Sequence, residues 1–358
     1  MEPSAAPSKP RTVFIVGAGA SKEVKLPIGS ELKKSIANAL DIRFEHGVRM
    51  TSGDGVIVEA LRLAAAASVP PTRDINPYLH SARLIRDAMP QALSIDNFID
   101  AHFHDKRLEL CGKLAIARTI LQAEAASTLF VDQARNQTKL DFGQLENTWF
   151  GYFTQLLTEN CRVADLPARL ASVVLIIFNY DRCIEHYLYY ALQNYYAITP
   201  SDAALLLQKL EIYHPYGTVG SLPWLSPRNS IEFGSEPHPK KLLELAGQIK
   251  TFTEGTDATS SQIDAIRTQM TTAHRMVFLG FAFHRLNLGL LLPEGSVRPA
   301  PSDRRTFATG LGLSSSDAEA IAAELVDKGA MAAANVRVRN DLTCGQLFRE
   351  YWRSMSFA

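Results

Sequence analysis

One amide and one imidazole are the strongest candidates for chemistry in this chain. Asn179 directly follows the unbroken apolar run "VVLIIF" at 173–178, and Asp181 comes shortly after it. His214 follows a second, shorter apolar run, with Gly217 in the loop behind it. An amide can hold a hydroxyl group or a water molecule, and an imidazole with a pKa near neutrality can accept a proton from either. The four residues therefore predict a site for polar chemistry at the ends of two strands.

Each of these residues also has a purely structural alternative. Asn179 and Asp181 could form a turn that caps the next helix, which is a common use of both residue types. A single histidine such as His214 is more often structural than catalytic. Both interpretations stay open, because only the fold can bring the candidates together.

Two glycine-containing turns add a possible ligand site. In "VFIVGAGAS" at 13–21, Gly17 permits a tight turn and Gly19 permits a pyrophosphate to approach backbone N–H groups at a helix start. Lys22 stands where the dinucleotide fingerprint has its third glycine, so the alternative is an ordinary strand-to-helix turn. The pattern G-x-x-x-x-G-K-[ST] is absent, which argues against a P-loop ATPase. The residues expected to bind phosphate groups are Gly17, Ala18, Gly19 and Ser21.

The second of these turns lies in "MVFLGFAF" at 276–283. Gly280 permits a close backbone approach there, and Phe281 could cover a base or a sugar. We therefore add both residues to the expected binding site.

The elements that must position these residues follow an alternating pattern. Apolar strands are separated by helical periodicity, which predicts an α/β fold with a Rossmann-like, mostly parallel sheet and helices on both faces. Ligands bind beyond the carboxyl ends of such strands, where the polar candidates lie. The expected strands are at 13–16, 173–178, 211–214 and 276–283, with two more in 305–314 and 335–341.

The same pattern divides the chain into three parts. Residues 1–11 are rich in Pro, Ser and Ala, which predicts a flexible tail. Residues 12–45 and 171–358 form the Rossmann-like domain. Residues 46–170 have helical periodicity with almost no strand signal, which predicts a helical insertion or lid.

Composition excludes several classes of protein. The 37 basic and 37 acidic residues give no net charge, so no direct nucleic-acid binding is expected. The longest strongly apolar run is too short to cross a bilayer, so no membrane anchor is expected.

The four cysteines are widely spaced without a C-x-x-C pair, which predicts reduced thiols in a cytoplasmic protein and no zinc ribbon. His102 and His104 lie too close in sequence to share a helix face, and no metal is expected.

Taken in order, these motifs resemble the sirtuin-like family, and specifically its bacterial branch of NAD-consuming antiphage-defence proteins. That family opens with G-A-G-x-S, as residues 17–21 do, and has N-Y-D after a buried strand, as residues 179–181 do. A histidine-glycine loop and a late strand similar to "LGFAF" at 279–283 follow. "SIDNF" at 94–98 looks like a short acidic motif of these proteins, which makes Asp96 a further candidate.

Two departures refine what the resemblance implies. Deacetylating sirtuins carry a four-cysteine zinc module that this chain cannot build, and their histidine is followed directly by glycine, whereas Pro215 and Tyr216 intervene here. The missing module favours an NAD glycohydrolase, with NAD as substrate and nicotinamide and ADP-ribose as products. The alternatives are an NAD-dependent protein deacylase or ADP-ribosyltransferase, and a non-catalytic NAD or ADP-ribose sensing module.

The resemblance also assigns roles and partners. Asn179 and His214 would be catalytic, while Asp181 would orient Asn179. An abortive-infection effector of this kind must be restrained, so we expect gating by homo-oligomer assembly or by a partner such as a HerA-like ATPase. The remaining expected binding residues are Asp181, Gly217, Gly280 and Phe281.

Overall fold

The computed structural model describes residues 11–357 except 133–138, 229, 252–253, 255–260, 294–300, 302 and 330. Its main sheet has six strands in the order β5-β4-β1-β6-β7-β8, and all neighbouring pairs are parallel. Numbered along the chain, this is the 3-2-1-4-5-6 order of a Rossmann fold. The predicted fold class is therefore confirmed. The strands are β1 (Thr12–Val16), β4 (Val173–Ile177), β5 (Glu211–Tyr213), β6 (Arg275–Leu279), β7 (Arg305–Thr309) and β8 (Val336–Arg339).

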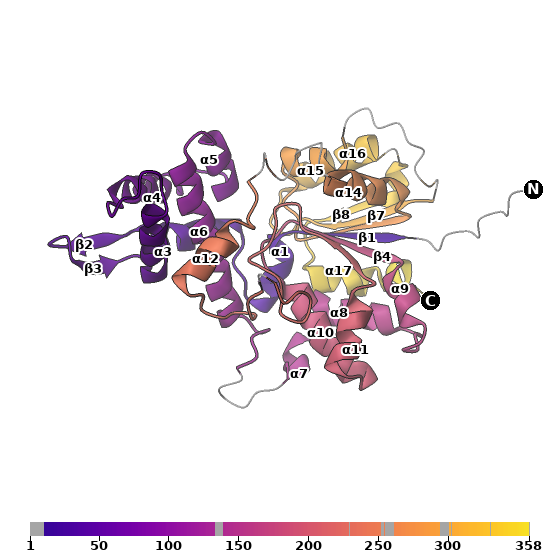
Figure 1. Ribbon diagram of the computed structural model, residues 1–358. Helices are drawn as coiled ribbons and strands as arrows, with labels where there is room; N and C mark the ends of the chain where they lie inside the picture. Colours follow the sequence, from indigo (N-terminus) through magenta and orange to yellow (C-terminus); the bar gives the residue numbers. More distant parts are fainter. Residues whose placement is uncertain are drawn as a thin grey trace, which may run out of the picture.

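Both faces of the sheet are covered, which explains the unbroken apolar runs. Alternate side chains of β1 point to opposite faces: Val13 and Ile15 lie in one hydrophobic core, and Phe14 and Val16 lie in the other. Figure 1 shows helices on each side of the sheet. One side has α14 (Ser261–Thr272), α15 (Arg285–Leu291) and α16 (Ser315–Lys328), and the other has α8 (Trp149–Thr158), α10 (Cys183–Tyr196), α11 (Pro200–Leu207) and α17 (Cys344–Glu350).

A separate helical lobe stands beside the sheet, at the left of Figure 1. It is joined to β1 through α1 (Ala18–Ser21) and through α2 (Gly29–Leu40), which packs on two lobe helices. The Tyr180 hydroxyl, in the loop after β4, donates a hydrogen bond to Asp96 in the lobe, so the lobe lies over the carboxyl ends of the strands. The helical lobe consists of β2 (Arg43–Glu45), β3 (Arg49–Ser52), α3 (Gly55–Ala66), α4 (Asn76–Ala88), α5 (Ile95–Ala101), α6 (Lys106–Ala126) and α12 (Pro239–Ala246).

The lobe differs in three ways from the insertion expected at 46–170. The strands β2 and β3 form a hairpin whose side chains are mostly exposed, so it has no apolar run to reveal it. Helix α8 lies within the expected insertion but packs on the sheet. Its Phe153 contacts Phe14 of β1 edge-on at 5.0 Å. Helix α12 lies outside it but packs on α3 and α6.

The expected tail at 1–11 lies outside the described residues except for Arg11. This residue is held in place, since its carbonyl oxygen accepts hydrogen bonds from the amides of His274 and Arg275, and its guanidinium lies 2.6 Å from Glu211. In the part of the chain that the structure describes, every helix is too short or too polar to cross a membrane. The remaining short helices are α1 (Ala18–Ser21), η1 (Lys22–Val24), α7 (Phe142–Leu145), α9 (Leu166–Leu170), η3 (Ala333–Asn335) and α18 (Trp352–Met355).

A buried ion pair joins Arg182, just before α10, to Glu124 of the lobe helix α6, and both side chains also bond to the backbone of the long loop after β5. The guanidinium of Arg182 and the carboxylate of Glu124 form two hydrogen bonds, of 2.5 and 3.1 Å, and the two residues are 2% and 0% exposed. Arg182 also donates to the carbonyl oxygen of Ile231 at 2.7 Å, and Glu124 accepts from the amide of Gly234 at 3.0 Å. The pair therefore holds the loop by its backbone.

Candidate functional site

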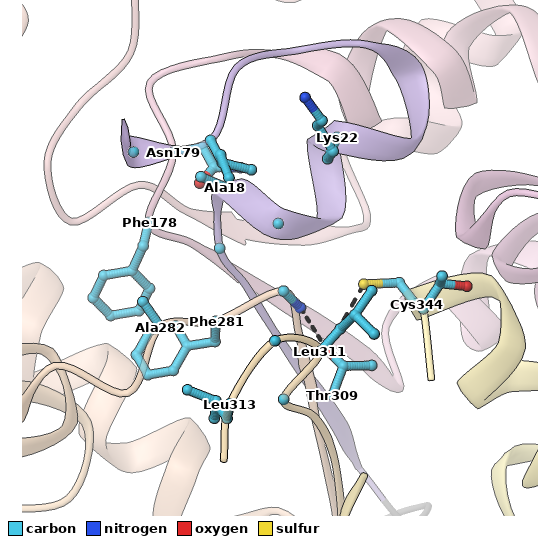
Figure 2. A pocket seen from close by; sticks show the side chains of 18 of the residues that line it. Ala18, Lys22, Phe178, Asn179, Phe281, Ala282, Thr309, Leu311, Leu313 and Cys344 are labelled. Atoms are coloured by element: carbon cyan, nitrogen blue, oxygen red, sulfur yellow. Dashed lines mark hydrogen bonds between the residues drawn. The ribbon is translucent and has the colours of Figure 1, made fainter. Parts of the chain in front are cut away.

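A cavity of about 640 Å³ opens at the carboxyl ends of the strands. Its walls come from the loops after β1, β4, β6 and β7 and from the segment 342–344 at the start of α17, as Figure 2 shows. The strand order reverses between β1 and β6, which is where Rossmann-like sheets bind their ligands. The volume falls within the range of small-molecule sites.

The floor of this cavity is made by two loops whose backbones touch. The amide of Gly17 donates to the carbonyl of Leu279 at 2.9 Å, and the amide of Gly19 donates to the carbonyl of Gly280 at 3.0 Å. A Cβ atom on Gly280 would lie 2.1 Å from the nitrogen of Ala20. The glycines therefore let the two loops approach, and the amide of Gly19, expected to bind a pyrophosphate, is already occupied. Ala18, between them, lines the cavity.

Replacing Gly280 with alanine should lower the free energy of unfolding by about 2 kcal/mol or more. The residue has a φ of 55°, which strains any side chain, and the new methyl group would meet backbone that cannot move aside. Urea denaturation measures the effect. The matched control is Gly289→Ala in α15, where a Cβ would meet nothing within 4 Å and where alanine favours the helix. Equal stability of Gly280→Ala and wild type would show that the loops do not need this contact.

Asn179 lies in the cavity wall at the end of a chain of hydrogen bonds. Its amide nitrogen donates to the Ser21 hydroxyl at 3.0 Å, and that hydroxyl donates to Asp181 at 2.9 Å. Asp181 also accepts from the amide of Cys183 at 3.1 Å. Because the Ser21 hydroxyl gives its proton to Asp181, it can only accept from Asn179, which leaves the Asn179 amide oxygen for a ligand. Ser21 and Asp181 are buried behind the wall, so Ser21 positions Asn179 in this structure and does not reach the cavity.

His214 lies directly behind Asn179. Its Nδ1 is 3.3 Å from the backbone oxygen of Asn179, and its Nε2 is 2.7 Å from a carboxylate oxygen of Glu185. Burial lowers the pKa of His214, but the charge and hydrogen bond of Glu185 outweigh burial and raise it. The imidazole is thus linked to the cavity through Asn179 and does not itself line it.

The other expected residues divide between the cavity and its surroundings. Phe281 lines the cavity next to Phe178, and their rings meet edge-on at 5.0 Å (Figure 2). Gly217 lies outside it, in a turn with a φ of 73° that packs against the backbone of Gln248. Asp96 is also outside, and burial raises its pKa even though it accepts the hydrogen bond from Tyr180.

Sequence reasoning missed several residues that shape the cavity. The Thr309 hydroxyl, at the end of β7, accepts from the amide of Gly280 at 2.8 Å and so supports the floor (Figure 2). A polar residue before a glycine at a strand end was a usable signal for it. Glu23 accepts from the amides of Trp149 and Gly345 at 2.6 and 2.9 Å, which caps α8 and α17. No local pattern reveals this role, because both partners are far away in sequence.

His102 and His104 lie just after the C-terminal end of α5. Nδ1 of His102 bonds to the backbone oxygen of Phe98 at 2.9 Å. Over the described residues, no group of three or more His, Cys, Asp or Glu side chains is arranged to hold a metal ion.

The structure is that of a Rossmann-like α/β protein with a cavity at the switch point of its sheet. Comparisons of the chain with protein-family models and with curated proteins gave no match.

Proposed function

We propose that this chain is an NAD glycohydrolase of the sirtuin-like family, which cleaves NAD to nicotinamide and ADP-ribose. The observation that carries the proposal is that Asn179, backed by His214, lies in the wall of the cavity at the switch point. The cavity volume and the Rossmann strand order suit a dinucleotide.

The proposed reaction needs little from the protein. Nicotinamide in NAD is already a cationic leaving group, so its bond to ribose C1′ breaks with the electron pair moving to the nicotinamide nitrogen. The site must stabilise the oxocarbenium-like carbon and place a water molecule. The amide oxygen of Asn179 accepts a hydrogen bond from that water or from a ribose hydroxyl. As the new C–O bond forms, the water gives up a proton to His214, which passes it to solvent.

The proposed cellular role is that of a cytoplasmic antiphage effector. An enzyme that depletes NAD must be inactive in a healthy cell, so we propose that homo-oligomer assembly, or a partner such as a HerA-like ATPase, gates the activity.

One observation favours a second candidate, a non-catalytic NAD or ADP-ribose sensing module. Both ring nitrogens of His214 face acceptors within the protein, so no lone pair points to the cavity in this structure. A binding module would keep this arrangement, whereas an enzyme must release one nitrogen.

The deciding experiment is incubation of the purified protein with NAD, followed by chromatography and mass spectrometry of the products. We expect nicotinamide and ADP-ribose to appear without any added acceptor. Release of nicotinamide only when an acyl-lysine peptide or another protein acceptor is added would favour the deacylase or transferase. Tight NAD binding without turnover over a range of protein concentrations would favour the sensing module.

A further inference from the structure

Glu185 is an unusual acid in this site. It stands in the first turn of α10, directly behind the cavity wall, and is only 6% exposed. One carboxylate oxygen is 2.7 Å from Nε2 of His214. The other is buried and has no hydrogen-bond partner in the part of the chain that the structure describes. A buried acceptor without a partner costs stability, so a purely structural role does not explain this residue well.

The hydrogen bonds of His214 determine where its protons lie. Both ring nitrogens face oxygen acceptors, and both contacts are satisfied only when both nitrogens carry a proton. The charged groups that act on the ring are Glu185 on α10 and Asp181 in the loop after β4, and both are acids. Glu185 is the closer partner and bonds to the ring directly.

We propose that Glu185 is a positioning residue for NAD cleavage, which holds a proton on Nε2 of His214 and leaves Nδ1 as the atom that accepts the proton of the attacking water. This inference rests on the proposed function. When His214 loses one of its two protons, the carboxylate keeps the proton on Nε2, as the acid of a catalytic triad does for its histidine. The free lone pair is then on Nδ1, which faces the backbone oxygen of Asn179 in this structure and must be released from it to meet the water. The accepted proton restores the imidazolium.

The first test compares the pH dependence of NAD cleavage in wild type and Glu185→Gln. Glutamine keeps the size of the side chain but removes its charge. We expect kcat to fall about a hundredfold or more while KM changes little, because NAD binding does not involve this residue. Activity requires His214 to lose a proton, so it rises with pH through the pKa of His214. Glu185→Gln removes the strongest causes that raise the pKa of His214, and the charge of Asp181 and the bond to the Asn179 backbone remain as smaller ones, so the acid limb should move to lower pH.

Two further variants separate positioning from general damage. Glu185→Asp keeps the charge, and should keep an acid limb close to that of wild type with partial activity. The matched control is Glu211→Gln at the start of β5, the strand that leads to His214, where the carboxylate bonds to Arg11 and Gln269. We expect it to leave kcat and the acid limb unchanged. Wild-type kcat and pH dependence in Glu185→Gln would overturn the inference.

The second test does not depend on activity. The His214 ring resonance, assigned by its loss in His214→Asn, is titrated by NMR in wild type and in Glu185→Gln without NAD. We expect a lower titration midpoint in the variant, and an unchanged midpoint would refute the role of Glu185 whatever the enzyme does. A shifted midpoint in a protein that does not cleave NAD would support the pairing and refute the proposed function.

Discussion

Asn179→Ala should slow NAD cleavage about a hundredfold or more, which corresponds to near 2.7 kcal/mol of activation free energy. The amide is the polar side chain that the loop after β4 contributes to the cavity wall, and its oxygen is the atom left for the substrate or water. Alanine removes that acceptor. The measurement is the rate of nicotinamide release under saturating NAD.

The fold should survive this substitution. The Ser21 hydroxyl still donates to Asp181, and the cost of the lost hydrogen bond is about 1 kcal/mol. Thermal denaturation of the variant checks this point. Asn38→Ala, at an exposed position of α2, is the matched control and should cleave NAD at the wild-type rate. If Asn179→Ala also cleaves NAD at that rate, Asn179 has no part in the mechanism.

Glu124→Ala should lower the free energy of unfolding by about 3–5 kcal/mol, the largest stability effect that we expect in this chain. The substitution leaves the guanidinium of Arg182 buried without its counter-ion, and it removes the acceptor for the amide of Gly234. The loop after β5, which carries Gly220 and Ile231, loses its tie to α6. The midpoint and slope of urea denaturation measure the change.

The matched control is an ion pair at the surface. Glu236 pairs with Arg118 but is 70% exposed, so Glu236→Ala should cost less than about 1 kcal/mol. Arg118 keeps its second partner, Asp54, at 2.8 Å. Similar midpoints for Glu124→Ala and Glu236→Ala would mean that burial adds nothing to the Arg182 pair.

The central strands of the sheet could be predicted from sequence because they are buried on both faces. β1 and β4 are apolar at every position or nearly so, and a run of that kind at strand length needs no tertiary context to be recognised. The hairpin β2–β3 shows the opposite case. Its residues are exposed or only partly buried, with Phe44 and Met50 packed against the core, so it has no apolar run to mark it.

The partners of each helix were not predictable in the same way. Helical periodicity shows that a segment has an apolar face, but it does not show what covers that face. Phe153 of α8 meets the sheet, whereas the apolar residues of α12 meet a lobe built from residues more than a hundred positions earlier. The expected boundaries at 46 and 170 therefore follow the periodicity and not the packing.

The sequence by itself determined the residue types of the candidate site and their places at strand ends. Only the tertiary structure decided which of them work together. β4 pairs with β1, so Asn179 lies beside the first glycine turn, and Glu185 lies beside His214 because α10 returns along the same sheet. The hydrogen bond that occupies the amide of Gly19 also depends on the fold, since its acceptor, Gly280, directly follows β6, which pairs with β1. A hydrogen bond depends on distances of about 3 Å, and separation along the chain says little about distances on that scale.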